Sequence, residues 1–168
     1  MPFSRTGCIP LLGSLSLVAA DAALAQPATV TANDNRRPAG VLAGSVLTVR
    51  LYAGEGEWRP EENDGPSLPV AAFGEEGGPL LTPGPLLRVP EGTAVIVHVR
   101  NGLTTRLNIH GLETRPATDA AVISIPPGET REIRFGSGNP GTYHYWATTA
   151  GSALATRTAI DSQLGGAL

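Results

Sequence analysis

The side chains best suited to chemistry are three histidines, His98, His110 and His144. An imidazole ring can act as a base or supply a nitrogen ligand to a transition metal. Residues 142–148 form a predicted strand, and side chains alternate between the two faces of a strand. One face then carries Thr142, His144, Trp146 and Thr148, and the opposite face carries Tyr143, Tyr145 and Ala147. The alternation therefore predicts that His144 and Trp146 share one surface.

Nucleophilic catalysis is not expected from these residues. It requires a serine or cysteine beside a base, and residues 151–153 lack the GxSxG elbow of serine hydrolases. His98 lies in the middle of a predicted strand, which favours a partly exposed strand residue over a ligand. The single cysteine, Cys8, lies in an N-terminal segment that we expect to be removed. The mature chain would then have no disulfide and no blue-copper site, which needs a cysteine thiolate with two histidines.

Short strands separated by glycine and proline turns must position these residues. Segment 94–100 is rich in β-branched residues and segment 46–52 alternates, so both are predicted strands. Their apolar faces carry Leu47, Val49 and Leu51 in one strand and Val95, Val97 and Val99 in the other. Further predicted strands cover 68–73, 105–110, 122–125, 132–135 and 142–148. Seven or eight short strands without a helical period predict an all-β sandwich.

Four segments, in order along the chain, carry a resemblance to a known family. Residues 82–92, TPGPLLRVPEG, resemble its PGPTIRVxxGD segment, and residues 107–112, LNIHGL, resemble its HWHGL segment. Residues 125–149 contain PGTYHYWATT and resemble its PGTYWYHSH segment, and residues 161–168 resemble its QxxDGLYGPL segment. The chain thus resembles the N-terminal, plastocyanin-like cupredoxin domain of the multicopper oxidases. The resemblance implies a Greek-key β-sandwich of cupredoxin topology, copper as cofactor and an association with oxidoreductases.

The same resemblance implies degenerate copper ligands. In the family, two His-x-His pairs of this domain help to hold a three-copper cluster. The first pair falls on Asn108 and His110, and the second on Trp146 and Thr148. Copper needs several converging imidazole or sulfur ligands, and indole offers only an N–H donor. We therefore expect no normal cluster, and we expect the isolated mature chain not to oxidise phenolic substrates, ferrous ions or cuprous ions.

Three functions remain open on the sequence alone. The first is an oxidase-like cupredoxin domain that serves as a scaffold, or is a fragment, of a longer oxidase-like protein. The second is a small exported copper-binding protein that uses His110 and His144, with Asn108 or the mature N-terminus as a third ligand. The third is a β-sandwich that binds a non-metal ligand, although Trp146 lies opposite the two tyrosines and cannot form one aromatic platform with them.

The N-terminal region predicts export. Residues 1–25 read as a signal peptide, with a positive charge at Arg5, an apolar run and a small-x-small cleavage site at 23–25. Residues 26–43 show no sustained period and are predicted to be a flexible leader. The mature protein would be secreted or periplasmic and free of the membrane. The net charge of -3 offers no basic field for nucleic acid.

Residues 44–168 are predicted to form the cupredoxin domain, with its final strand incomplete. In the family, the segment that matches residues 165–168 opens a longer closing strand. We expect the strand beside it to be left unpaired, exposing backbone donors and acceptors. Further cupredoxin domains or a partner chain would then complete the sheet.

Overall fold

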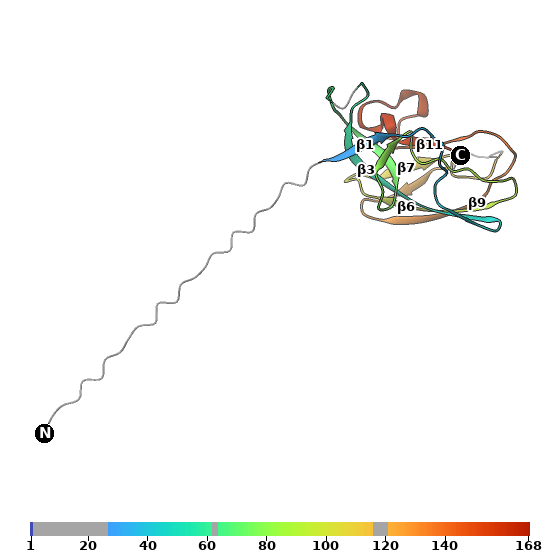
Figure 1. The fold of residues 1–168 in the computed structure, drawn as a ribbon, viewed down its shortest axis with the longest axis horizontal. Coiled ribbons are helices and arrows are strands. Elements are labelled where there is room, and N and C mark those ends of the chain that lie inside the picture. The colour runs from blue at the N-terminus through green and yellow to red at the C-terminus, as the bar shows by residue number, and fades with distance from the viewer. Residues whose placement is uncertain (2–26, 62–63, 116–120) are drawn as a thin grey trace.

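The computed structural model describes residues 1, 27–61, 64–115 and 121–168. Residues 2–25 of the predicted signal peptide lie outside this set. Nearly all regular structure is β, arranged as two sheets (Figure 1), which confirms the predicted all-β sandwich. Within the described residues, no helix has the length and apolar character needed to span a membrane.

The larger sheet has the strand order β1-β5-β4-β3-β6-β9, and β2 pairs with β3 at its side. The smaller sheet has the order β11-β10-β7-β8. The larger sheet consists of β1 (Ala28–Ala32), β2 (Val41–Ala43), β3 (Val46–Trp58), β4 (Leu68–Glu75), β5 (Leu80–Thr82), β6 (Ala94–Asn101) and β9 (Thr130–Gly136). The smaller sheet consists of β7 (Leu107–His110), β8 (Ile123–Ile125), β10 (His144–Thr148) and β11 (Gly165–Ala167). Two short 3-10 helices, η1 (Leu154–Thr156) and η2 (Ala159–Gln163), lie between β10 and β11.

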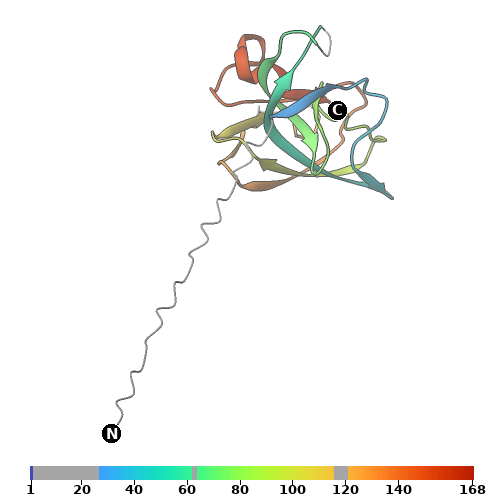
Figure 2. The same cartoon turned by 60° about the vertical axis from the view of Figure 1, so that its left-hand side comes forward.

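The core lies between the two sheets. The predicted apolar faces of β3 and β6 are confirmed, since Leu47, Val49 and Leu51 and Val95, Val97 and Val99 are all buried. From the smaller sheet, Ile109, Tyr145 and Ala147 belong to the same buried cluster. Figure 2 shows the two layers after a 60° turn. Because the inward residues of β7 and β10 hold the sheet against the core, their alternate residues face away from it.

Two parts of the segment 26–43, which we predicted to be a flexible leader, form strands. β1 pairs in parallel with β3 and β5, and β2 pairs with the start of β3. Only Val30 of β1 is buried, so the segment carries too little apolar alternation to be recognised in isolation. Gly56 allows the close approach, because a Cβ there would lie 2.6 Å from the Ala28 carbonyl oxygen.

β3 is also longer than predicted. It continues to Trp58, beyond residue 52 where the predicted strand ends, and β4 pairs with it from Leu51 to Trp58. The small and charged residues of this half, GEGE, have low β propensity. Pairing with β4 on one edge and with β1 on the other supplies the hydrogen bonds that propensity alone would not favour.

The strand next to the C-terminal segment is not left unpaired, which corrects the expectation from the sequence. β11 pairs antiparallel with β10, and Tyr143 and Leu168 exchange two backbone hydrogen bonds of 2.9 Å. On the other edge of β11, the Gly84 amide donates to the Gly165 carbonyl and the Leu87 amide donates to the Ala167 carbonyl. Both edges of this short strand therefore have backbone partners.

Candidate functional site

The candidate site is the outward face of β7 and β10. These antiparallel strands place Asn108 opposite Thr148 and His110 opposite Trp146. The residues between them, Ile109 and Ala147, are fully buried on the core side. The register thus brings the four positions singled out from the sequence together as two directly facing pairs. Side chains in such pairs lie close enough to interact.

The first pair forms an aromatic stack. The rings of His110 and Trp146 are nearly parallel, with centroids 4.0 Å apart and an interplanar angle of 7°. The Arg157 guanidinium lies over the Trp146 ring, 5.3 Å from its centroid. Arg157 is close to Gly165 of β11, whereas His110 belongs to β7 on the other side of β10. Trp146 is therefore flanked by the imidazole on one side and by a cation on the other.

Burial shifts the titration of both groups that flank Trp146. It lowers the pKa of the His110 imidazole, although the nearby Glu113 carboxylate raises it. It also lowers the pKa of the Arg157 guanidinium, although Asp161 raises it. The charged form of each group is thus penalised by lost solvation. Arginine still remains a cation, because its unperturbed pKa is above about 12.

The second pair is tied to a buried carboxylate. Asp161, on η2, is only 3% exposed. It accepts hydrogen bonds from the Thr148 hydroxyl at 2.7 Å, the Thr149 amide at 2.8 Å and the Thr149 hydroxyl at 2.8 Å. Burial raises the pKa of Asp161, but these hydrogen bonds and a longer one from the Ala150 amide outweigh it and leave the pKa below its ordinary value. Thr148 was predicted to share the outward face of β10, and Asp161 covers it.

Asn108 is also engaged by a neighbouring strand. Its side-chain oxygen accepts a hydrogen bond of 2.9 Å from the Ser124 hydroxyl on β8. That oxygen is the atom with which an asparagine would bind a metal. Asn108, one of the two candidates for a third copper ligand, is thus already hydrogen-bonded within the sheet.

The predicted metal pair, His110 and His144, lies on one face of the smaller sheet. His144 is two residues from Trp146, which directly faces His110, so the two histidines are diagonal neighbours. Such neighbours have Cβ atoms roughly 7–8 Å apart. Among the described residues, no three His, Cys, Asp or Glu side chains are grouped so that they could hold a metal ion. The prediction of a metal at His110 and His144 therefore stays a prediction.

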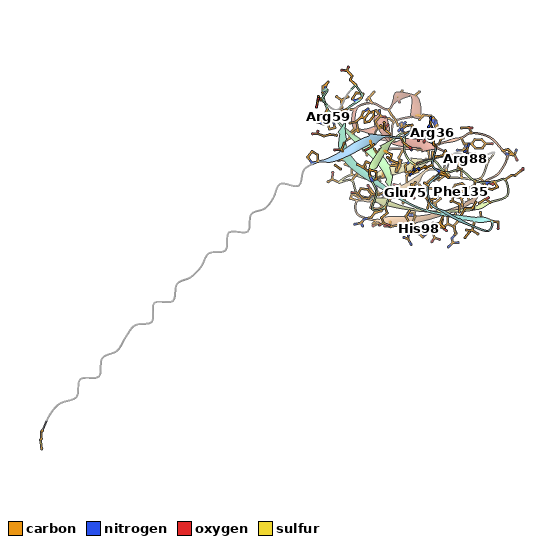
Figure 3. All side chains as sticks on the ribbon, viewed as in Figure 1. Arg36, Arg59, Glu75, Arg88, His98 and Phe135 are labelled. Atoms are coloured by element: carbon orange, nitrogen blue, oxygen red, sulfur yellow. The ribbon has the colours of Figure 1, made fainter. Side chains whose placement is uncertain are left out.

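His98 lies apart from this site, as expected. It belongs to β6, and Figure 3 labels it. When it is protonated, it forms an ion-pair contact of 3.8 Å with Glu132 on β9. Its side chain is about one-quarter exposed, at 24%. This agrees with the prediction of a partly exposed strand residue.

Comparison with known proteins supports the same fold and family. A family model described as multicopper oxidase matches residues 81–163. Similar solved structures include a multicopper oxidase from Campylobacter jejuni described as a metallo-oxidase, with 22% identity over 84% of this chain and 29% of that chain and a TM-score of 0.54. This chain carries a cupredoxin-like domain of the multicopper oxidase family. The identification confirms the family proposed from the four sequence segments.

Two further structures agree with this assignment of the cupredoxin fold. Lac15 from a marine microbial metagenome is 19% identical over 73% of this chain and 32% of that chain, with a TM-score of 0.55. A copper nitrite reductase from Nitrosomonas europaea is 24% identical over 73% of this chain and 40% of that chain, with a TM-score of 0.55. The cupredoxin domain thus spans less than half the length of each of these three chains. None of the curated protein sequences matches it.

Copper is the metal that the family implies, and the residues at the ligand positions fit it poorly. Of the four positions, three hold an amide, an indole and a hydroxyl. The indole has no lone pair available for a metal, and the amide oxygen and the hydroxyl are held by Ser124 and Asp161. The fourth, His110, has its ring stacked on Trp146. This donor set does not fit the family's cluster.

The sequence analysis missed two functional residues, Arg157 and Asp161. Both lie between β10 and β11 and return to β10 through the 3-10 helices. Arg157 Nη1 donates to the carbonyl oxygens of Ala147, Asp161 and Leu164. Neither residue belongs to a strand pattern, so no periodicity could have pointed to them. The only available signal was a pair of opposite charges in an otherwise uncharged segment, 149–168.

Gly111, directly after His110, fixes the approach of β7 to β10. Its φ is +82°, and a Cβ there would lie 2.1 Å from the His144 carbonyl oxygen. We expect Gly111→Ala to lower the free energy of unfolding by about 2–3 kcal/mol, because it adds a backbone clash to an unfavourable φ. Thermal or urea unfolding measures the change.

Gly77→Ala provides a matched control for this substitution. Gly77 has nearly the same φ, +83°, with nothing within 4 Å of an added Cβ. The Gly77→Ala substitution should therefore lower the free energy of unfolding by about 1 kcal/mol, from the backbone conformation alone. Equal losses in the two variants would show that close packing at Gly111 does not position the site.

Proposed function

We propose that this protein is an exported scaffold domain of the multicopper oxidase type. At the four positions that hold copper in the family, Asn108, His110, Trp146 and Thr148, its side chains contact other protein groups instead of copper. We call these four positions the rebuilt surface. The single observation that carries the proposal is the register of β7 and β10. It brings all four ligand positions together, and each is occupied by a side chain engaged with protein. A cupredoxin fold is thus retained while its cluster ligands are replaced.

The rebuilt surface supports a structural role in particular. The stack of His110 and Trp146 and the hydrogen bonds of Asp161 join β7 and β10 to the segment that leads into β11. Oxidase activity, where it occurs, would belong to further cupredoxin domains on a longer polypeptide or on a partner chain. Export rests on the signal-like composition of residues 1–25.

A second candidate function is copper binding through His110 and His144. The diagonal placement of these histidines on adjacent strands favours it. Two imidazoles hold copper weakly unless a third ligand converges on them. The stack on Trp146 fixes the orientation of the His110 ring, so a metal would have to lie in the plane of that ring.

Restoring ligands tests the scaffold function. We expect Asn108→His combined with Trp146→His to gain copper that survives dialysis, because three histidines would then converge from adjacent strands with His144 beside them. Metal analysis and electron paramagnetic resonance measure the gain. Thr148 is left unchanged so that its buried bond to Asp161 is preserved.

The unmodified protein is the reference for this variant. It should retain no stoichiometric copper and should not oxidise phenolic substrates, ferrous ions or cuprous ions. Copper-dependent turnover by the pure unmodified protein would contradict the proposal. A folded double variant that gains no copper would show that the four positions do not form a ligand surface here.

A further inference from the structure

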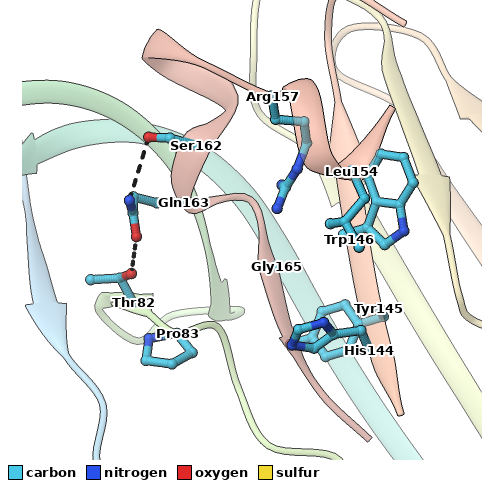
Figure 4. Close-up of a pocket in the computed structure, with 10 residues that line it drawn as sticks. All are labelled: Thr82, Pro83, His144, Tyr145, Trp146, Leu154, Arg157, Ser162, Gln163 and Gly165. Carbon is cyan, nitrogen blue, oxygen red and sulfur yellow. Dashed lines mark hydrogen bonds between the residues drawn. The ribbon is translucent and has the colours of Figure 1, made fainter. Parts of the chain in front are cut away.

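A small cavity lies beside the rebuilt surface, between β10, β11 and the end of β5. It has a volume of about 160 Å³. Figure 4 shows Arg157, Trp146 and His144 on one side of it and Gln163 and Thr82 on the other. At roughly 30 Å³ for each water molecule, the space would hold about five. A ligand of about five non-hydrogen atoms is therefore of suitable size.

The polar groups around this cavity favour an anion. The side chains around it that can carry a positive charge are the Arg157 guanidinium and the His144 imidazole, and no Asp or Glu lines it among the residues that the structure describes. The nearest carboxylate on η2, that of Asp161, is directed to Thr148 and Thr149. Asp161 acts on the Arg157 guanidinium from outside the cavity, so the positive charge that faces the cavity is only partly compensated.

Arg157 is held so that its Nη2 remains available as a donor. Its Nη1 is committed to three backbone carbonyls, which fixes the guanidinium. Its Nη2 has no hydrogen-bond partner among the described residues and lies 3.6 Å from the position a Cβ would take on Gly165. Because Gly165 has no side chain, the space beside Nη2 stays open. An immobilised guanidinium loses little side-chain entropy when it binds a ligand.

The side chain of Gln163 is also held so that a donor remains available. Its side-chain oxygen accepts a hydrogen bond from the Thr82 hydroxyl, which leaves the amide nitrogen as the free end. That nitrogen makes only a long contact of 3.4 Å with the Ser162 hydroxyl (Figure 4). The acceptor is thus used within the protein and a donor is left for a ligand. The indole of Trp146 and the side chain of Leu154 add apolar surface.

We propose that this cavity binds a small carboxylate, with Arg157 Nη2, the Gln163 amide and His144 around the carboxylate oxygens and a short apolar tail against Trp146 and Leu154. A charge-assisted hydrogen bond to a carboxylate is about twice as strong as a neutral one. The apolar walls distinguish a carboxylate with a tail from a fully polar oxyanion such as sulfate. The proposal does not depend on the scaffold function, since it involves neither copper nor the four ligand positions other than Trp146.

Titration of the purified protein with sodium propionate at constant ionic strength tests the proposal. Proton–nitrogen NMR reports binding through the indole N–H of Trp146, which Trp58→Phe distinguishes from the second tryptophan of the chain. We expect saturable shifts of Trp146 and of the backbone around His144. Arg157→Gln should weaken binding about tenfold or more, through loss of a charge-assisted hydrogen bond. Sodium sulfate should bind more weakly than propionate.

Two further variants keep the test decisive if Arg157→Gln fails to fold after losing three backbone contacts. His144→Ala removes an exposed imidazole from the wall of the cavity and should also weaken binding. His98→Ala removes the histidine of the other sheet and should leave binding unchanged. Propionate shifts that do not saturate, equal affinity in the His144→Ala and His98→Ala variants, or equal affinity for sulfate would each overturn the proposal.

Discussion

Asp161→Ala is expected to lower the free energy of unfolding by about 3 kcal/mol. The substitution leaves the buried Thr148 hydroxyl and the Thr149 amide without their acceptor. An unsatisfied buried polar group costs more than the net value of the hydrogen bond that is lost. Urea unfolding followed by circular dichroism measures the change. This effect is large because one carboxylate joins the end of β10 to η2.

Asp161→Asn and Asp34→Ala give this prediction its controls. Asparagine keeps the size of the side chain and one acceptor oxygen, so we expect a smaller loss of about 1–2 kcal/mol. Asp34 has a side chain that is 66% exposed, and its replacement should change stability by less than about 0.5 kcal/mol. Equal stabilities of the Asp161→Ala and Asp34→Ala variants would show that the contacts of Asp161 do not support the fold.

The ionisation of Asp161 also makes the stability of the fold depend on pH. Its pKa is lowered in the folded protein, so the folded state favours the carboxylate. The resulting stability is fully present above the unfolded pKa of about 3.9 and is lost as the pH falls through the folded value. The stability difference between the unmodified protein and Asp161→Asn should therefore be constant near neutral pH and should narrow below about pH 4. A difference that changes between pH 6 and 8 would contradict this assignment.

Tyr145→Ala is the second substitution with a large expected effect. Tyr145 is fully buried, packs against Phe73 with ring centroids 5.6 Å apart, and donates a hydrogen bond of 2.6 Å to the Pro85 carbonyl. Burial raises the pKa of its hydroxyl, so the group stays a donor at all physiological pH values. Loss of the ring should lower the free energy of unfolding by about 3–5 kcal/mol, because it leaves a cavity in the core. Thermal unfolding monitored by near-ultraviolet circular dichroism measures this loss.

Tyr143 provides a matched control for the hydroxyl of Tyr145. Its hydroxyl also donates to a backbone carbonyl, that of Asn139, but at an exposed position. We expect Tyr145→Phe to lower the free energy of unfolding by about 1–2 kcal/mol, because the buried Pro85 oxygen loses its donor. Tyr143→Phe should leave the free energy of unfolding almost unchanged. Equal effects of the two substitutions would show that burial of the bond to Pro85 does not matter.

The strands with regular alternation were predictable, because one buried face leaves a period of two in the sequence. Val95, Val97 and Val99 of β6 are an example. β1 was not predictable, because only Val30 of its residues is buried and its pairing depends on Gly56 in another strand. A contact between segments that are far apart leaves no local period.

The candidate site was predictable only in part, for the same reason. The four ligand positions follow from the resemblance and lie together, as the register of β7 and β10 confirms. The burial of Thr148 was not expected, because the residue that covers it, Asp161, comes from an irregular segment. The stack of Arg157 on Trp146 likewise depends on how residues 149–164 return to the sheet.

The most direct test of the replaced copper surface is a copper titration of the purified, unmodified protein. Metal analysis after dialysis and electron paramagnetic resonance would compare it with His110→Ala and with His98→Ala as the matched control. Our interpretation predicts no stoichiometric copper and the same weak signal in all three proteins, because Asn108, Trp146 and Thr148 are engaged with protein. Stoichiometric copper in a nitrogen-rich tetragonal site, lost in His110→Ala and kept in His98→Ala, would contradict it.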